Sequence, residues 1–557
     1  MARFSCTKII IILFYVLLFL LLSCTTLQNT KTKVKAFPFH TNGRWIVDEE
    51  EGGKRVKLAC LSWMAHGLAV VAEGLSKQPL DSITKRIRPM GFNCIRLTWP
   101  LELVINESLA SLTVKESFNR LGLFDDINGI QAHNPSILDL PLINAFQAVV
   151  KSLGDKMVIL DNHCTKPSMC CSETDQNGFF GDKYFDPHVW IKGLTKMATM
   201  FNGVTNVVAM SLRNEPRGPR SNLKDWYRYM AEGAEAVHGA NPNVLVIISG
   251  LVWDQDLSFL KNQPLKLSFN GKLVFEVHQY SYGKGPGWQI ENPNKMCAKI
   301  LGEAMRNSSF LLEQGRPVML SEFGVNMKGT NLGDNRFLNC YLGMLAELDM
   351  DWALWTLVGS YYIRNGDFIV GAGEVYGVLN EDWIRVRNAS ILHKISAVQL
   401  PFRGPGLSSK ANKQHKVIFH PLTGLCVLTK STVDPLRLGP CSNSDHWQYK
   451  PQETKLSIEG TLLCLKAYGE GKAPKLGREC SSPNSTWKMV SDSKMHLSSR
   501  VNKNGSSVRV CLDVDTTNNI IVTNTCKCLT THKSCDAESQ WFKLVDSCNQ
   551  ESREFWR

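Results

Sequence analysis

The stretch NVVAMSLRNEPRGPR, residues 206–220, decides how the N-terminal part of this 557-residue chain is expected to fold. Residues 207–210 form a short apolar run, which is typical of a parallel strand that is buried on both faces. Glu215 follows the run and precedes a loop rich in proline and glycine. Catalytic side chains of an α/β barrel stand at such strand ends, so Glu215 is a candidate catalytic acid. The plain alternative is a loop acid in a salt bridge to Arg213 or Arg217.

Seven further apolar runs of this kind lie between about residues 57 and 357. In chain order the eight runs are VKLACLSW, FNCIRLTW, KMVILDNH, NVVAMSLRN, VLVIISGL, LVFEVHQY, PVMLSEFG and DWALWTLV. Helix-compatible segments separate them, and alternating strands and helices imply a parallel sheet. Eight such units in roughly 300 residues match the size of a closed (β/α)8 barrel. An open doubly wound sheet is disfavoured because no G-x-G-x-x-G motif follows the first run.

The first 24 residues have the pattern of a secretory signal peptide. Arg3 and Lys8 precede an apolar run of 14 residues, 9–22, which is short for a membrane span. An uncleaved signal anchor is the alternative interpretation. No later segment holds 18 uninterrupted apolar residues, so we expect the mature protein to be soluble, without stable membrane insertion. The signal peptide predicts that the protein is secreted, outside the cell or in the cell wall.

Secretion makes the 18 cysteines candidates for disulfide bonds rather than for metal or redox chemistry. The adjacent pair Cys170 and Cys171 predicts a loop staple, because zinc-type spacing is missing around it. We therefore expect no metal and no cofactor. The net charge of +12 is scattered along the chain, which indicates a solvated surface and no nucleic-acid partner. Five glycosylation tripeptides fit the same compartment: Asn106, Asn307, Asn388, Asn484 and Asn504.

The sequence pattern changes after residues 401–413, which are rich in glycine, proline, serine and lysine and are typical of a linker. Three similar segments follow, beginning at GLCVLTK, TLLCLKAY and VRVCLDVD. Each has a second cysteine 15 or 16 residues after the first and a tryptophan before a β-like ending. Repeats of about 40 residues bury a core only against their neighbours, so we expect one all-β unit.

Four regions follow from these patterns: a signal peptide at 1–24, a barrel at 25–400, a linker at 401–413 and a β unit at 414–557. The cysteines of each repeat are natural disulfide partners, and Cys528 is an alternative to Cys526 in the third repeat. The expected pairs are Cys426–Cys441, Cys464–Cys480 and Cys511–Cys526.

Polar and aromatic residues end most of the eight apolar runs. A barrel brings strand ends from distant parts of the chain onto one rim. Two carboxylates on such a rim are the minimum for cleaving a glycosidic bond, because one protonates the leaving oxygen while the other attacks the anomeric carbon. The strand-end residues are Arg96, His163, Asn214, Glu215, His278, Tyr280, Glu322 and Trp355.

Each neighbour of the two carboxylates has a chemical role to offer. Asn214, beside Glu215, suits a hydrogen bond to the sugar 2-hydroxyl. Arg96 near Glu322 would keep that carboxylate ionised. The others supply an orienting hydroxyl, an apolar face for a sugar ring and two polar contacts: Tyr280, Trp355, His163 and His278.

The ordered motifs IRLTWP, LDNHC, RNEP, EVHQY, SEFG and WALW resemble glycoside hydrolase family 5, the cellulase family of clan A. The resemblance spans about residues 44–400, and plant members with long loops are the most similar. It implies that Glu215 is the acid/base and Glu322 the nucleophile. It also places the other six strand-end residues around the substrate.

The repeats resemble the ricin B-type lectin family, a β-trefoil whose repeats end in Gln-x-Trp. Here the repeat ends read DHWQY, STWKM and SQWFK, so the tryptophans remain while the glutamine motif is degraded. Sugar sites of that family use an aspartate after the first cysteine, which only the third repeat retains. The possible lectin site is therefore Asp513, Gln540 and Trp541, and a trefoil with a structural role alone is the alternative.

Together these features predict a retaining β-glycoside hydrolase, similar to an endo-β-glucanase, that acts on β-linked cell-wall polysaccharide. A second glycan bound through the trefoil is a possible further partner. The alternatives are a hydrolase of mannan, small glycosides or glycolipids, and a lectin-like carbohydrate-binding protein with an inactive barrel. The presence of both carboxylates and of Arg96 argues against the inactive barrel.

Overall fold

The computed structural model describes residues 38–168, 170–364, 368–407, 414–515, 517–530 and 535–548. The predicted signal peptide lies outside these ranges. Within them, no helix combines the length and the apolar character that crossing a membrane requires.

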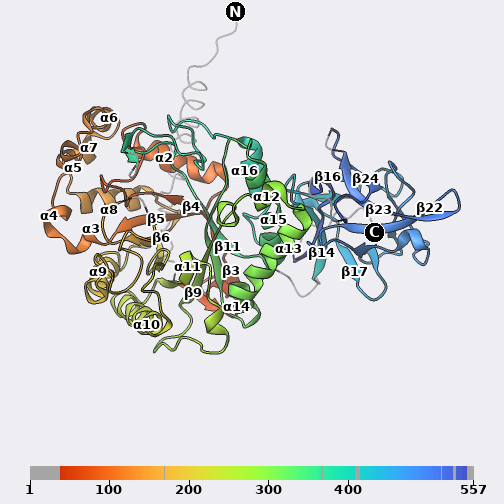
Figure 1. Ribbon diagram of the computed structural model, residues 1–557, viewed down its shortest axis with the longest axis horizontal. Coiled ribbons are helices and arrows are strands. Elements are labelled where there is room, and N and C mark those ends of the chain that lie inside the picture. The colour runs from red at the N-terminus through yellow and green to blue at the C-terminus, as the bar shows by residue number, and fades with distance from the viewer. Residues whose placement is uncertain are drawn as a thin grey trace, which may run out of the picture. The chain divides into compact units, whose positions relative to one another are not determined.

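Eight parallel strands close into a barrel in the order in which they occur along the chain (Figure 1). Each of the eight apolar runs predicted from the sequence coincides with one of these strands to within a few residues, so the predicted barrel is confirmed. The strands are β4 (Ala59–Trp63), β5 (Cys94–Pro100), β6 (Met157–Cys164), β7 (Val207–Ser211), β8 (Leu245–Ser249), β9 (Leu273–Tyr280), β10 (Val318–Gly324) and β11 (Asp351–Leu354).

Helices lie around the strands of the barrel (Figure 1). Those between β4 and β6 are α2 (Leu80–Ile87), α3 (Glu102–Ile105), α4 (Glu107–Ala110), α5 (Val114–Arg120), α6 (Phe124–His133), α7 (Pro135–Leu138) and α8 (Leu142–Ser152). Those from β6 onward are α9 (Pro187–Met200), α10 (Leu223–Ala240), α11 (Leu251–Asp254), α12 (Gly287–Ile290), α13 (Pro293–Ala304), α14 (Phe310–Glu313), α15 (Leu332–Leu348) and α16 (Ala389–Ser396).

Helix α10 shows how the sequence specifies an outer helix. Its N-cap is Asn222, whose side chain accepts a hydrogen bond from the backbone N–H of Asp225. Its buried side chains recur every three or four residues, which places them on the one face that packs against the barrel. They include Trp226, Met230, Ala234 and Val237.

The residues that point into the barrel change from apolar to polar along the strands. On β6, Met157 and Ile159 belong to an apolar cluster, and Asp161 follows at the same spacing of two. On β9, Val274 is followed by Glu276 in the same way. The apolar layer closes the amino end of the barrel, so the polar groups gather at its carboxyl end.

Two small sheets accompany the barrel. Strands β1 (Phe39–Asn42), β2 (Trp45–Asp48) and β3 (Lys54–Arg55) form an antiparallel sheet that precedes the barrel strands in the chain. Strands β12 (Ile363–Arg364) and β13 (Ile369–Val370) pair in the long connection that follows β11.

The C-terminal region is an all-β, trefoil-like domain with a curled antiparallel sheet of 12 strands. Strand β25 pairs with β14, so the last repeat closes onto the first. The strands are β14 (His415–His420), β15 (Leu425–Leu428), β16 (Arg437–Gly439), β17 (Trp447–Lys450), β18 (Lys455–Ile458), β19 (Cys464–Lys466), β20 (Lys475–Gly477), β21 (Lys488–Met489), β22 (Leu497–Lys503), β23 (Ser506–Asp515), β24 (Ile520–Thr525) and β25 (Lys543–Ser547).

The three disulfides predicted within the repeats, Cys426–Cys441, Cys464–Cys480 and Cys511–Cys526, are all present. Cys528 does not replace Cys526, because it bonds to Cys535. The barrel region adds three more bonds, Cys60–Cys94, Cys170–Cys171 and Cys297–Cys340. The first joins neighbouring residues of β4 and β5 inside the barrel.

The C-terminal domain packs against the barrel helices α13 and α15. The indole N–H of Trp541 donates to Oδ1 of Asn294 at 2.9 Å, and Lys543 pairs with Glu347 on α15 at 2.6 Å. The predicted linker is fixed to the barrel where it begins, since the backbone N–H of Phe402 donates to Asp349 at 3.0 Å. These contacts make the C-terminal domain part of the same packed unit as the barrel.

Candidate active site

A pocket of about 680 Å³ lies at the carboxyl ends of the barrel strands. Strands β6, β9 and β10 contribute to its lining, together with the loops that follow β6, β7, β8, β9 and β11. Its volume is in the range of ordinary ligand-binding sites. Six of the eight predicted site residues line it: His163, Glu215, His278, Tyr280, Glu322 and Trp355.

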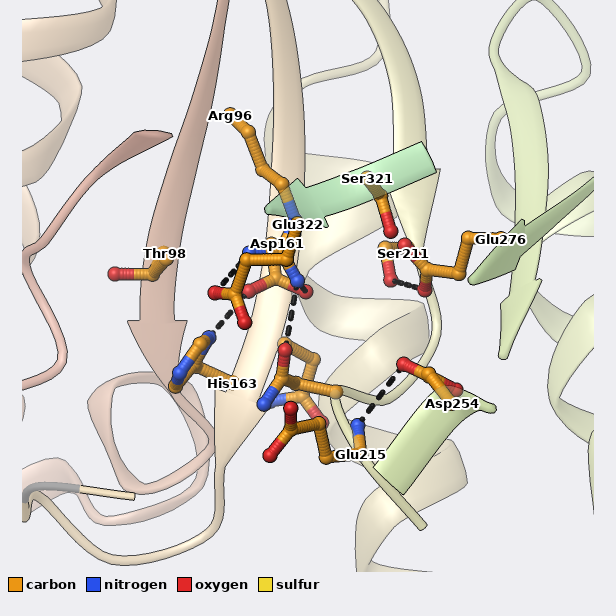
Figure 2. Close-up of polar contacts among 12 residues, drawn as sticks. Arg96, Thr98, Asp161, His163, Ser211, Glu215, Asp254, Glu276, Ser321 and Glu322 are labelled. Atoms are coloured by element: carbon orange, nitrogen blue, oxygen red, sulfur yellow. Dashed lines mark hydrogen bonds and ion pairs between the residues drawn. The ribbon is translucent and has the colours of Figure 1, made fainter. Parts of the chain in front are cut away.

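The two remaining predicted residues, Arg96 and Asn214, are fully buried beneath the pocket. A guanidinium N–H of Arg96 donates to Oδ1 of Asn214 at 2.7 Å, and another pairs with Glu322 at 3.2 Å. Arg96 also pairs with Asp161 at 3.1 Å (Figure 2). One buried cation thus holds residues from β6, β10 and the loop after β7 in fixed relative positions.

The two glutamates lie close together, with His278 between them. Nδ1 of His278 is 3.0 Å from Oε1 of Glu215 and 3.2 Å from Oε2 of Glu322. One oxygen of each carboxylate falls within 4.8 Å of the other. The barrel therefore brings together two carboxylates that are more than a hundred positions apart in the sequence.

Burial shifts the proton equilibria of these groups. It raises the pKa of Glu215 and of Glu322 to about 7 in each case, because a buried carboxylate loses its hydration. His278 and Arg96 act in the opposite direction on Glu322. Burial also lowers the pKa of His278.

Contacts, rather than burial, make the two carboxylates different. Both carboxylates contact His278, and Glu322 also contacts the permanent charge of Arg96. The contact with Arg96 favours negative charge on Glu322, while the charges of Arg217 and Arg96 also lower the pKa of Glu215. The negative charge of Glu215 in turn raises the pKa of Glu322.

The backbone at Glu215 is held in an unusual conformation. Its φ is +46°, in the left-handed region that non-glycine residues seldom occupy. The N–H of Glu215 donates to Oδ2 of Asp254 at 3.2 Å (Figure 2). Arg217 donates to the carbonyl of Glu215 at 2.8 Å. Strained residues of this kind persist where the surroundings hold them, as they do here.

Three buried acids behind the pocket were absent from the sequence prediction. Asp161 accepts from Nδ1 of His163 at 2.7 Å, Glu276 accepts from Ser211, and Asp254 supports Glu215. Asp161 and Glu276 each precede a predicted histidine by two positions, so the strand period was a usable signal for them. Asp254 ends the short helix α11, outside the barrel strands, and had no such signal.

Sequence reasoning also missed the residues that loops bring to the pocket. They are Cys170, Cys171, Val252, Trp253, Gln255, Tyr282, Tyr361, Arg364, Glu374 and Tyr376, with Gln279 and Gly283 beside Tyr280. Cys170 and Cys171 do not staple a loop as predicted, because they bond to each other, and both line the pocket.

Three groups of side chains in the described ranges have metal-ligand chemistry. Two belong to the pocket: Glu215, His278 and Glu322 form the carboxylate pair with its histidine, and in the other group the sulfur atoms near His163 are bonded to each other. The third is His415, His446 and Glu459 in the C-terminal domain, where the two imidazoles stack with centroids 3.6 Å apart. The expectation of no metal stays a prediction.

The structure places the possible lectin residues in internal contacts. The side-chain N–H of Gln540 donates to Oδ2 of Asp513 at 3.0 Å, and Asn524 donates to the same oxygen at 3.1 Å. Asp513 is only 2% exposed, and Gln540 and Trp541 are fully buried. Trp541 contributes its N–H to the contact with the barrel.

Comparisons with known proteins agree with this geometry. A model of the cellulase family, glycosyl hydrolase family 5, matches residues 61–360. A glycosyl hydrolase 5 family protein from Chamaecyparis obtusa is 41% identical over 529 residues, which cover 92% of this chain and 94% of that protein. An endoglucanase from Paenibacillus polymyxa is 22% identical over 391 residues, 66% of this chain and 88% of that one.

Solved structures match the barrel. A hyperthermophilic endocellulase from the archaeon Pyrococcus horikoshii superposes with a TM-score of 0.52 at 20% identity, covering 65% of this chain and 99% of its own. The catalytic domain of the major endoglucanase from Xanthomonas campestris pv. campestris gives 0.51 at 20% identity, with coverages of 65% and 99%. These likenesses show the fold.

Proposed function

The chain belongs to glycosyl hydrolase family 5, the cellulase family, and on that premise we propose that it is a retaining endo-β-glucanase acting on β-linked cell-wall polysaccharide. It is a glycosidase that acts on O-glycosyl bonds. The observation that carries the finer proposal is the pair of carboxylates held within 4.8 Å of each other. Carboxyl groups are about 5 to 5.5 Å apart in retaining enzymes and about 6.5 to 9.5 Å apart in inverting ones, so oxygens of the two groups within 4.8 Å of each other support retention.

In the first step, Glu215 donates its proton to the glycosidic oxygen while Glu322 attacks the anomeric carbon. The leaving sugar departs as an alcohol and a glycosyl ester forms on Glu322. Arg96 keeps Glu322 ionised before the attack, and the raised pKa of Glu215 keeps the acid protonated near neutral pH.

In the second step, water replaces the leaving sugar. Glu322 is now an ester without charge, so the pKa of Glu215 falls and its carboxylate can take a proton from that water. Attack on the anomeric carbon then releases the sugar with its original configuration and restores ionised Glu322. Because the two carboxylates lie close together, each change in the charge of Glu322 shifts the pKa of Glu215 in the direction that the next chemical step requires.

The substrate is proposed from the pocket walls and the relatives. Trp253, Tyr282 and Trp355 line the pocket with apolar faces suited to sugar rings, as do Tyr280 and Tyr376. Similar chains from Paenibacillus polymyxa and Xanthomonas campestris are named endoglucanases. These two observations favour a β-glucan over mannan, small glycosides or glycolipids, and they favour an active barrel over a lectin-like one.

The experiment is a hydrolysis panel on the full chain. β-Glucans, mannans, aryl glycosides and a glycolipid are incubated with the wild type, and products are separated by length. We expect faster cleavage of β-glucan, with internal cuts that give mixed oligosaccharides. If another substrate of the panel is cleaved faster than β-glucan, that substrate replaces β-glucan in the proposal. If no substrate of the panel is hydrolysed, the inactive barrel is favoured.

The pH profile provides a further test. We expect kcat/KM to be bell-shaped with its maximum near pH 7, because Glu322 must be ionised and Glu215 protonated and both pKa values lie near 7. Acid protonates the nucleophile, and alkali removes the proton of the acid. Arg96→Met should move the acidic limb to higher pH, because Arg96 lowers the Glu322 pKa. An unmoved limb in this variant would contradict the assignment.

Secretion is proposed on the disulfide content. Seven disulfide bonds occur among the described residues, and such bonds persist in oxidising compartments. A microsequence of the purified mature protein that begins after residue 24 would support removal of the predicted signal.

For the trefoil-like domain we propose a structural role, in preference to sugar binding at Asp513. Burial acts to raise the pKa of this carboxyl, but its hydrogen bonds from Gln540 and Asn524 outweigh that and lower it. Asp513→Ala should lower the free energy of unfolding by about 1 to 3 kcal/mol, because buried donors lose their acceptor. Thermal unfolding measures this. A sugar that binds the wild type but not Asp513→Ala would restore the lectin site.

A further inference from the structure

The Cys170–Cys171 disulfide is a feature of the pocket that the proposed reaction does not use. Both cysteines are partly exposed and line the pocket beside His163 and Trp253. Their sequence separation is 1, so the bond joins no distant segments. Disulfides stabilise a fold mainly by closing long loops, and this bond closes none. Its effect is therefore local.

The local contact is with Asn214. The side-chain nitrogen of Asn214 lies 3.4 Å from Sγ of Cys171 and 3.7 Å from Sγ of Cys170. On its other side, Oδ1 of Asn214 accepts from Arg96 at 2.7 Å. Arg96 only donates hydrogen bonds, so the amide oxygen must face it and the amide N–H must face the sulfur atoms.

The disulfide is itself fixed relative to the segment that carries the acid. Arg217 donates to the carbonyl of Ser172 at 3.0 Å and to the carbonyl of Glu215 at 2.8 Å. Trp253 donates its indole N–H to the carbonyl of Cys171 at 3.3 Å. The sulfur atoms therefore keep a defined position beside Asn214 and Glu215.

We propose that the Cys170–Cys171 disulfide is a positioning element for Asn214 and, through it, a determinant of selectivity for sugars with a 2-hydroxyl. Sulfur is a weak acceptor, so it orients the amide N–H without holding it strongly. The two sulfur atoms lie in the pocket wall and the Asn214 amide behind them is fully buried, so a sugar 2-hydroxyl, which is a better acceptor, takes over that N–H by displacing them. The inference rests on the proposed function, in which Asn214 bonds the 2-hydroxyl of the sugar at the cleaved bond.

The experiment compares two aryl β-cellobiosides that differ only in having OH or H at position 2 of the sugar next to the cleaved bond. The test variant is Cys170→Ala/Cys171→Ala. The matched control is Cys528→Ala/Cys535→Ala, which removes a short-range disulfide outside the pocket. Thermal unfolding confirms that each variant is folded, and Cys170→Ser/Cys171→Ser serves as a second variant of the pair.

The wild type should cleave the 2-hydroxy substrate about 100-fold faster, since hydrogen bonds to this group strengthen in the transition state. Removing the pair should lower kcat/KM on that substrate about 10-fold, mainly through kcat, with less than about a twofold loss on the 2-deoxy substrate. The control variant should match the wild type on both. Such a difference is not expected from a general distortion of the loop.

Three results would overturn the inference. Equal losses on both substrates would show a distortion without selectivity for the 2-hydroxyl. Peptide mapping that links Cys164 to Cys170 or Cys171 would remove the bond itself. A wild type that hydrolyses both substrates equally would remove the Asn214 contact while leaving the hydrolase intact, whereas a wild type inactive on the whole panel would refute the proposed function.

Discussion

Glu322→Ala is expected to lower kcat on β-glucan by about 10⁵-fold, because the held carboxylate acts as an intramolecular nucleophile of high effective concentration. Added azide should restore turnover and yield the α-glycosyl azide. The small anion occupies the space that the carboxylate vacates and attacks from the same face, and no second inversion follows. Initial rates and the anomeric configuration of the azide product by NMR measure both effects.

A surface variant provides the control for this loss. Glu232 lies on α10 in an i,i+4 pair with Arg228, and its side chain is 41% exposed. Glu232→Ala should keep wild-type activity and should form no glycosyl azide. Hydrolysis at the wild-type rate in Glu322→Ala would contradict the assignment of the nucleophile.

Glu215→Ala is expected to lower kcat/KM on β-glucan by about 10²- to 10⁴-fold, the usual range for general acid catalysis. The loss in the first step should be much smaller on a dinitrophenyl glycoside, whose leaving group needs no proton. Azide should now yield the β-glycosyl azide, because it attacks the ester on Glu322 from the opposite face. Burst kinetics and product NMR separate these outcomes.

The comparison of leaving groups is an internal control for Glu215. A misfolded or displaced site would lose activity on both substrates, whereas loss of the acid spares the activated one. The alkaline limb of the pH profile should also disappear, since the group that must stay protonated is gone. Equal losses on both leaving groups would show that Glu215 supports the site by another route.

The barrel was predictable because its strands are buried on both faces. Each strand reads as a short, mainly apolar run, and the run from Val207 to Met210 could be recognised without any tertiary information. The same burial explains why polar residues that end such runs, such as His163 and Glu322, indicated a site. Polar groups in those positions are costly unless they face one another or a ligand.

The disulfides also fall into two groups, those that the sequence predicts and those that only the tertiary structure shows. Cys426–Cys441 and Cys464–Cys480 join positions within one repeat, so the internal similarity of the chain indicated them. Cys60–Cys94 depends on two strands lying side by side, and Cys297–Cys340 depends on two helices that pack together. Spacing alone gives no such information.

The pKa values of the two glutamates depend on distances between side chains, which cannot be read from the sequence. We expected different environments for Glu215 and Glu322, yet burial raises both pKa values to about 7. Arg96 lowers both pKa values by its charge, but it contacts Glu322 and not Glu215. A contact between residues 226 positions apart in the chain exists only once the barrel has closed.

By itself the sequence determined the barrel, the repeat domain and the residues at the strand ends. Apolar residues recur every two positions in strands and every 3.6 positions in helices, and such periods can be recognised within one short segment. Only the tertiary structure decided which groups touch. It placed Asp254 against the backbone of Glu215, the Cys170–Cys171 sulfur atoms against Asn214, and Trp541 in the contact with the barrel. The reason is physical: loop conformation and side-chain contacts depend on packing between distant segments, and no local period encodes that packing.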